Sequence, residues 1–196
     1  MLAAYGQSFT IRVSIKRLDT LVNTEISRLT PSDAQAYRSI MLRAFEKHPD
    51  AFRSSVSERS AEPLSWWESR LGTPPGANQM VFGAHVAGTL VGVAGIRFDA
   101  GKKTKHKATL FGMYVDNTAR GAGIGAQLLA AVLEQAHNRR ATRIVQLTVT
   151  EGNDAALQLY ERVGGFLRFG IEPYAVRIGS SYVSKIHMWR DLSIGR

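Results

Sequence analysis

A glycine-rich turn near the middle of the chain has the composition of an anion-binding site. It reads Arg120-Gly121-Ala122-Gly123-Ile124-Gly125-Ala126 and stands between a segment typical of a strand and one typical of a helix. Glycine lets the backbone approach a ligand closely and adopt positive φ. The free N–H groups of a first helical turn, the helix dipole and the Arg120 guanidinium all attract negative charge. The turn therefore predicts a cradle for a pyrophosphate, with a plain strand–helix connection as the alternative.

The residues around this turn restrict which anion it can bind. A P-loop requires Gly-Lys-Ser/Thr at its end, whereas Gly125 is followed by Ala126-Gln127. The dinucleotide pattern Gly-x-Gly-x-x-Gly/Ala is formally matched by Gly121, Gly123 and Ala126. That pattern also expects an acid at the end of the next strand to hold a ribose, and the strand predicted over 143–150 contains none. A nucleotide-dependent oxidoreductase is therefore the weaker interpretation.

Composition argues against several other classes of protein. The 196 residues suit one domain with a small extension, and no apolar run is long enough for a membrane-spanning helix. Cysteine is absent and the five histidines are scattered, so we predict neither a disulfide nor a metal site. The net charge of +9 attracts anions of many kinds. The lysines cluster over 102–107, where no nucleic-acid-binding motif accompanies them, and we predict a solvated hairpin tip.

Hydrophobic periodicity predicts the elements that position the glycine turn. Strands are expected over 24–29, 79–86, 90–98, 108–115, 144–150, 166–171 and 182–189. Helices are expected from Pro31 to a break at His48, and over 63–71, 123–135 and 154–163, the last capped by Asn153. Short turns join the early strands, which favours antiparallel pairing. The single strand–helix–strand unit predicts one parallel pair with a right-handed crossover.

Residues 1–23 are basic and contain no acid before Asp19. This composition is similar to that of a transit peptide, but the stretch has no clear cleavage signature and no long apolar core. We therefore expect an N-terminal extension over 1–23 that need not be ordered, followed by one domain over 24–192.

The stretch 109–166 resembles the GNAT superfamily of N-acetyltransferases. The family's Gln/Arg-x-x-Gly-x-Gly/Ala motif is matched by Arg120, Gly123 and Gly125. The family's Asn-x-x-Ala-x-x-Leu-Tyr-x-x-x-Gly-Phe block is matched over 153–166, with one extra residue after Tyr160. Two motifs in the right order are far more specific than either alone. The resemblance extends over about 24–192 and implies an α/β (α+β) fold: a mixed, largely antiparallel central sheet with flanking helices and one parallel, splayed strand pair.

The resemblance also implies a reaction, in which a primary amine directly attacks acetyl-CoA within a ternary complex. Pantetheine would pair with the backbone of Met113, Tyr114 and Val115. The cofactor's pyrophosphate would bind the turn, through Arg120, Gly121, Ala122, Gly123, Gly125 and Ala126. Asn153 would contact the pantetheine arm. Tyr160 would touch the cofactor and act as the catalytic acid for the departing thiolate, with a purely structural role in the core as the alternative.

Sequence leaves the other participants open. Many relatives carry a Glu on the central strand, but 109–115 contains no acid, and Glu151 and Asp116 are as readily explained as solvated side chains. The acceptor, a small molecule or a peptide, would meet the aromatic residues of the first two helices and the Ile171–Tyr182 stretch. We expect a cytoplasmic protein without specific nucleic-acid or membrane partners, and a homodimer stays open. An acetyl-CoA sensor of the same fold, without transferase activity, is the alternative function.

Overall fold

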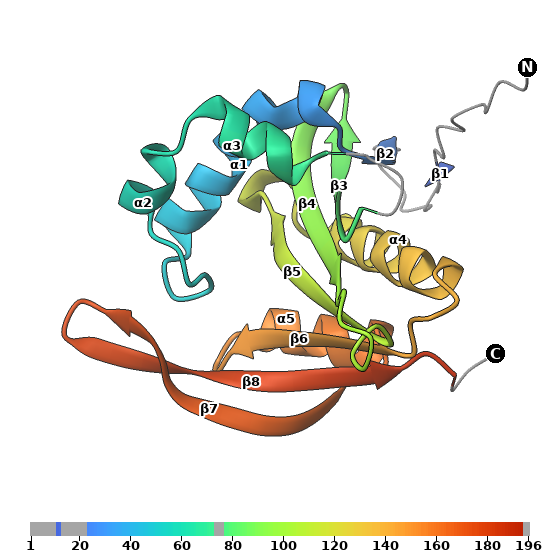
Figure 1. The fold of residues 1–196 in the computed structure, drawn as a ribbon. Coiled ribbons are helices and arrows are strands. Elements are labelled where there is room, and N and C mark those ends of the chain that lie inside the picture. The colour runs from blue at the N-terminus through green and yellow to red at the C-terminus, as the bar shows by residue number, and fades with distance from the viewer. Residues whose placement is uncertain (1–10, 13–22, 73–76, 194–196) are drawn as a thin grey trace, which may run out of the picture.

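The computed structural model describes residues 11–12, 23–72 and 77–193. The strands are β1 (Ile11–Arg12), β2 (Thr24–Arg28), β3 (Gln79–Val86), β4 (Thr89–Phe98), β5 (Lys107–Val115), β6 (Ile144–Thr150), β7 (Leu167–Ile178) and β8 (Ser181–Asp191). The helices are α1 (Ala34–Lys47), α2 (Val56–Ser60), α3 (Leu64–Arg70), α4 (Ile124–Asn138) and α5 (Asp154–Gln158). In Figure 1, α1, α2 and α3 gather on one side of β3 to β5, and α4 lies on the other.

The strands that the structure describes form one sheet in the order β1-β2-β3-β4-β5-β6-β8-β7. Every neighbouring pair is antiparallel except β5 and β6, which are parallel and joined by the α4 crossover. The predicted mixed, largely antiparallel sheet with one parallel pair is therefore confirmed. Of the predicted extension, Ile11 and Arg12 pair with Ile26 and Glu25 of β2. The rest of 1–22 lies outside the described residues, as does 73–76.

The parallel pair separates soon after it begins. β5 and β6 are paired only from Lys107 to Thr109 and from Ile144 to Gln146. Beyond that point β6 continues beside β8, and β5 continues beside β4. The edge of β5 over 110–115 therefore has no strand partner on the β6 side, so its backbone groups there are available to another chain or to a ligand.

An irregularity in β5 turns its last residues toward a different core. The register between β4 and β5 shifts between Val93 and Gly95, and Gly112 has φ +61°. Leu110 packs in the core that contains α4, whereas Tyr114 packs in the core that contains α1 and α3. Residues four apart on a regular strand would face the same side. The bulge thus lets one strand contribute to both cores.

The structure differs from the sequence-based expectation in three respects. Helix α2 was not predicted, although Ser55 and Glu58 form the capping box that starts it. The last two strands are longer than expected, so the Ile171–Tyr182 stretch consists of hairpin strands and a short turn rather than a loop. β7 tolerates Pro173 because it is an edge strand.

The third difference is in the helix predicted over 154–163. Regular α-helix ends at Gln158, and Leu159–Val163 is a π-helical segment in which the Gly164 N–H donates to the Leu159 carbonyl at 3.0 Å. This wider turn holds the extra residue of the motif and still leaves both Tyr160 and Phe166 buried. None of the helices in the described part of the chain is both long and apolar enough to cross a membrane.

Candidate functional site

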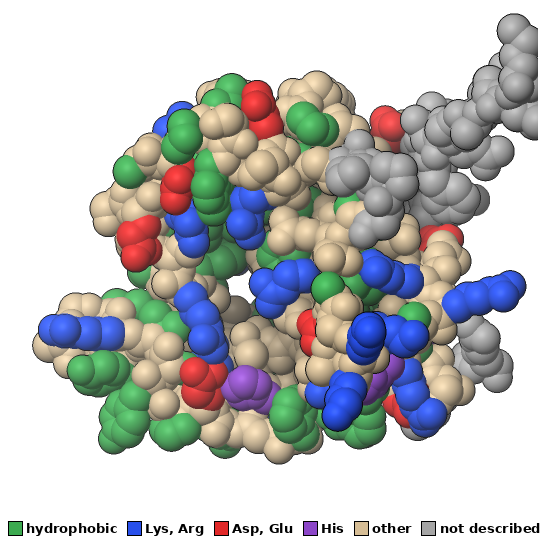
Figure 2. Space-filling model, in the orientation of Figure 1, with side chains coloured by type: hydrophobic (Ala, Val, Ile, Leu, Met, Phe, Trp, Pro, Cys, Tyr) green, Lys and Arg blue, Asp and Glu red, His purple; other side chains and the backbone are tan. Residues whose placement is uncertain are grey.

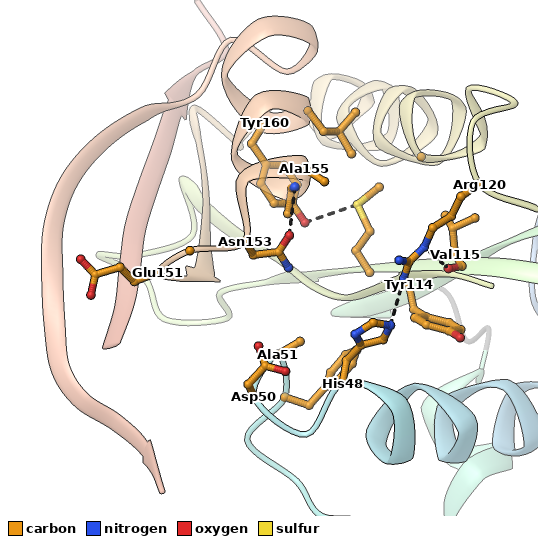
Figure 3. Close-up of a pocket in the computed structure, with 16 residues that line it drawn as sticks. His48, Asp50, Ala51, Tyr114, Val115, Arg120, Glu151, Asn153, Ala155 and Tyr160 are labelled. Carbon is orange, nitrogen blue, oxygen red and sulfur yellow. Dashed lines mark hydrogen bonds between the residues drawn. The ribbon is translucent and has the colours of Figure 1, made fainter. Parts of the chain in front are cut away.

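A cavity of about 520 Å³ lies where β5 and β6 separate. Its walls come from the end of α1 and the following loop, the end of β5, the glycine turn, and the segment from Glu151 to Tyr160 (Figure 3). It brings together seven of the predicted site residues, which are Met113, Tyr114, Val115, Arg120, Gly125, Asn153 and Tyr160. The other four, Gly121, Ala122, Gly123 and Ala126, do not line it but belong to the same turn and to the first turn of α4.

The glycine turn has the backbone geometry that requires glycine. Gly121 has φ +82° and Gly123 has φ +73°. Gly123 is the N-cap of α4, so the N–H groups that follow it belong to the first helical turn and have no acceptor within the helix. Gly125 is held closely, since a Cβ there would lie 3.3 Å from Leu159 and 3.6 Å from Met113. The start of α4 therefore presents donors beside the cavity.

The Arg120 side chain crosses from the turn to the end of α1. Its Nε donates to the Val115 carbonyl at 3.2 Å, and its Nη2 lies 3.0 Å from His48 Nε2 (Figure 3). A guanidinium has no acceptor atom, so His48 Nε2 accepts this bond and the neutral ring carries its proton on Nδ1. His48 was not predicted as a site residue, although the sequence His48-Pro49-Asp50 marks the break after α1.

Tyr160 and Asn153 face the cavity from the segment after β6. Tyr160 is 6% exposed, and its hydroxyl donates to the Met113 sulfur at 3.4 Å (Figure 3). Burial raises the pKa of Tyr160 well above its ordinary value. The Asn153 Oδ1 accepts from the Ala156 N–H at 3.2 Å, which confirms the predicted helix cap. A phenol that stays protonated and already contacts a sulfur atom can donate to another sulfur in the cavity.

The acids near the cavity differ in their surroundings. Asp116 accepts from the Thr118 N–H at 3.2 Å and pairs with Arg43 at 3.5 Å. These contacts, the Thr118 hydrogen bond first, lower the pKa of Asp116 and make it a poor base. Glu151 lines the cavity and is exposed. Among the residues that the structure describes, no group of His, Cys, Asp and Glu side chains could hold a metal ion.

Lys185 was missed by sequence reasoning. It is 2% exposed, and its Nζ donates to the carbonyls of Asp50 and Ala51, both at 2.9 Å, and to the Thr150 hydroxyl at 2.6 Å. Thr150 in turn donates to the Asp50 carbonyl at 2.8 Å. Burial lowers the pKa of Lys185. Lys185 and Thr150 thus attach the loop after α1 to β8 and β6 across the opening of the sheet.

Replacing Lys185 with methionine is expected to lower the free energy of unfolding by about 1–3 kcal/mol, because two half-buried carbonyls lose their charged donor. The measurement is urea-induced unfolding followed by tryptophan fluorescence. Lys103→Met is the matched control: it removes the same charge from the exposed hairpin tip and should change the free energy by less than about 0.5 kcal/mol. Equal stability of the two variants would show that the attachment contributes nothing.

Two further cavities continue from the first. One of about 460 Å³ shares Phe52, Met113, Asn153 and Tyr160 with it, among other residues, and lies on the side of Thr109 and Lys185. The other, of about 150 Å³, is lined by residues of α1, α2, α3 and β5 and of the loop before α2. The aromatic residues expected to meet an acceptor line this smaller cavity, and they are Phe45, Phe52, Trp66 and Trp67.

An unpaired strand edge, a glycine turn at a helix start and a buried phenol meet at one cavity where the sheet splits. The comparisons identify the family. The family model for the acetyltransferase (GNAT) family matches residues 41–166, so the chain belongs to that family.

The relatives are acetyltransferases of different kinds. The L-amino acid N-acetyltransferase AaaT of Escherichia coli is 30% identical over 124 residues, covering 63% of this chain and 74% of that protein. A mycothiol acetyltransferase of Salinispora tropica is 28% identical over 133 residues, covering 68% of this chain but only 41% of its own length. The solved structure of yncA from Salmonella typhimurium with its cofactor acetyl-CoA has a TM-score of 0.71 at 19% identity, covering 87% of this chain and 94% of that one.

Proposed function

We propose that this protein is an N-acetyltransferase that moves an acetyl group from acetyl-CoA to a primary amine in a ternary complex. The observation that carries the proposal is the unpaired edge of β5 over 110–115, lying between the glycine turn and Tyr160. An edge of this kind can pair with the amides of a pantetheine arm, as a strand pairs with a peptide. The free N–H groups at the start of α4 would then hold the pyrophosphate of the same ligand.

The reaction requires a nitrogen lone pair to attack the thioester carbonyl carbon, the carbon–sulfur bond to break, and the sulfur to take that electron pair. The amine nitrogen then loses a proton to water. The cleft residues hold the two reactants in contact, which removes most of the entropic barrier. A backbone N–H of Tyr114 or Val115 would polarise the thioester carbonyl. We assign no protein base.

Tyr160 would stabilise the departing sulfur. Its raised pKa exceeds the value of about 8.5 that is typical of a thiol, so complete proton transfer to a thiolate would be uphill. A hydrogen bond from the phenol costs no such transfer and still neutralises part of the developing charge. We therefore propose that Tyr160 acts mainly as a hydrogen-bond donor, a refinement of the expectation that it gives up its proton.

The comparisons support this proposal without fixing the acceptor. The Escherichia coli relative is named for amino-acid N-acetylation, and the Salmonella structure is described with acetyl-CoA as its cofactor. The mycothiol relative is more than twice as long as the part that matches. A homodimer stays a prediction.

The decisive experiment has two arms. Isothermal titration measures acetyl-CoA binding, and release of free thiol is followed with a broad panel of amines. Binding together with release for at least one amine is the expected result. Binding without release for any amine would favour the sensor, and absence of binding would overturn both functions.

A further inference from the structure

Building on the proposed function, we propose that the acceptor amine carries a carboxylate, and that Arg70 binds this carboxylate in the 150 Å³ cavity beside α3. The class of substrate would then be a free amino acid rather than a simple amine or polyamine. The inference comes from the position of the cavity, from the charges of its lining and from the indole N–H of Trp67, which has no hydrogen-bond partner among the described residues.

The cavity is placed to hold one end of an acceptor. It shares Phe52, Arg53, Phe111 and Gly112 with the 460 Å³ cavity, and Gly112 directly precedes Met113. The 460 Å³ cavity in turn meets the proposed acetyl-CoA cavity at Met113 and Tyr160. A molecule whose amine lies in the middle cavity can therefore extend its other end into the smallest one.

The charges of this cavity do not balance. Its lining contains three arginines, Arg53, Arg59 and Arg70, and no acid. Arg53 pairs with Glu172 at 2.7 Å, and Arg59 lies 3.6 Å from Glu62. Arg70 forms no ion pair with any residue that the structure describes. One positive charge is thus left over, which matches a monoanion such as a carboxylate.

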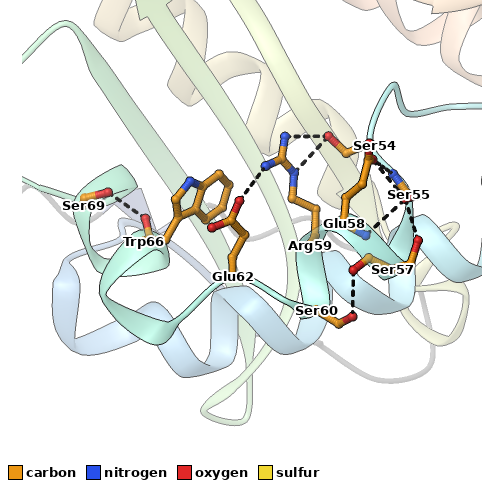
Figure 4. Close-up of polar contacts among 9 residues, drawn as sticks. All are labelled: Ser54, Ser55, Ser57, Glu58, Arg59, Ser60, Glu62, Trp66 and Ser69. Atoms are coloured by element: carbon orange, nitrogen blue, oxygen red, sulfur yellow. Dashed lines mark hydrogen bonds and ion pairs between the residues drawn. The ribbon is translucent and has the colours of Figure 1, made fainter.

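The surrounding side chains restrict the orientation of the guanidinium groups of Arg59 and Arg70. Arg70 and Arg59 lie over the Trp66 ring, with their guanidinium carbons 4.5 Å and 4.7 Å from its centroid. The Arg59 Nε and Nη2 donate to the Ser54 hydroxyl at 3.0 Å and 2.8 Å, so this guanidinium is already engaged (Figure 4). Stacking on an aromatic face restricts a guanidinium without using its donors. Burial raises the pKa of Tyr37, and the neighbouring Arg70 guanidinium partly offsets that rise. A guanidinium has five N–H donors, so Arg70 can contact the Tyr37 hydroxyl and still have donors left to bind a carboxylate.

A second, independent observation points to a missing acceptor. Trp67 lines the same cavity and is 1% exposed, yet its indole N–H has no hydrogen-bond partner among the described residues. A buried donor without an acceptor is costly, and a ligand oxygen that reached the N–H after a shift of the ring would remove that cost. Basic side chains also gather around the hollow between the α1–α3 side and the β8 side in Figure 2, so an anion would be attracted to this face.

The test uses pairs of acceptors in which a neutral amide replaces the carboxylate. L-Phenylalanine, L-leucine, γ-aminobutyrate and ε-aminocaproate are each compared with the corresponding amide, so that the spacing between amine and carboxylate varies. At least one acid should have a KM about tenfold lower than its amide. Arg70→Met should raise the KM of that acid about tenfold, leave kcat nearly unchanged, and leave the amide unaffected. Arg70→Lys, which keeps the charge but not the fork of donors, should fall between them.

Arg140→Met is the matched control, since it removes an exposed arginine outside the three cavities and should preserve the preference for the acid. Acids and amides used equally well, or a preference that survives Arg70→Met, would overturn the inference while leaving the transferase intact. If no acceptor leads to release of thiol, the melting temperature of the protein is measured with each acid and each amide, with and without CoA. This measurement tests the carboxylate site independently of transferase activity. A larger shift with the acid that is lost in Arg70→Met supports the carboxylate site, and equal shifts refute it.

Discussion

Gly123→Val is expected to weaken acetyl-CoA binding at least about a hundredfold while the protein remains folded. Gly123 has φ +73° as the N-cap of α4, a conformation that β-branched residues rarely adopt. The turn would relax toward negative φ and rotate the first N–H groups of the helix away from the proposed pyrophosphate site. Loss of several charge-assisted hydrogen bonds accounts for the size of the effect. Isothermal titration with acetyl-CoA measures it directly.

Gly179→Val separates this local effect from general strain. Gly179 has φ +61° in the turn between β7 and β8, and a Cβ there would meet nothing within 4 Å. Both variants should lose a comparable free energy of unfolding, about 1–2 kcal/mol, but Gly179→Val should bind acetyl-CoA normally. An affinity that stays normal in Gly123→Val, or falls equally in both variants, would mean that the turn is not the cradle.

Tyr160→Phe is expected to reduce kcat about a hundredfold, the effect of losing one well-placed donor to a developing negative charge. Acetyl-CoA affinity should change by less than about threefold, because the ring remains packed edge-on against Phe166, 6.0 Å away, and the lost hydrogen bond from the hydroxyl reaches only a thioether. Steady-state kinetics with a saturating acceptor, combined with titration of acetyl-CoA, distinguishes the two effects.

Tyr182→Phe serves as the control, since it removes the same hydroxyl from an exposed position on β8. The pH profile adds an independent readout. Burial raises the pKa of Tyr160, so its protonated form persists as the pH rises, and no loss of rate from this group is expected below about pH 10. Turnover of Tyr160→Phe equal to that of the unaltered enzyme would assign stabilisation of the sulfur to water or to the backbone.

Most of the fold could be predicted because its signals are local. β3 and β6 begin and end at the predicted residues, and the crossover through α4 required β5 and β6 to be parallel. Hydrophobic periodicity does not predict a point within one strand at which its side chains switch to the other face of the sheet. The bulge at Gly112, which turns Tyr114 into the other core, depends on how β4 pairs with β5 and not on the residues of β5 alone.

The site was predictable where a motif carried it and not where tertiary contacts created it. Arg120, Gly125, Asn153 and Tyr160 come from the two motifs and line one cavity. Lys185 gave no signal, because a lysine in an exposed hairpin and a lysine bonded to two carbonyls of a distant loop look the same in sequence. Arg70 follows Trp66 by four residues on the helix predicted over 63–71, so their stacking is local. The cavity that they share with Phe52 and Phe111 exists only in the folded chain.

The brief pairing between β5 and β6 divides the sheet into two parts, joined at one end by three residue pairs. One part carries the glycine turn, and the other carries Asn153, Tyr160 and Lys185. The Lys185 and Thr150 hydrogen bonds to the loop after α1 provide a second attachment across the opening. In the proposed reaction, the alignment of donor and acceptor would therefore depend on the angle between the two half-sheets. A substitution at Thr109 or Gln146 would change that angle and with it the distance between the two bound reactants.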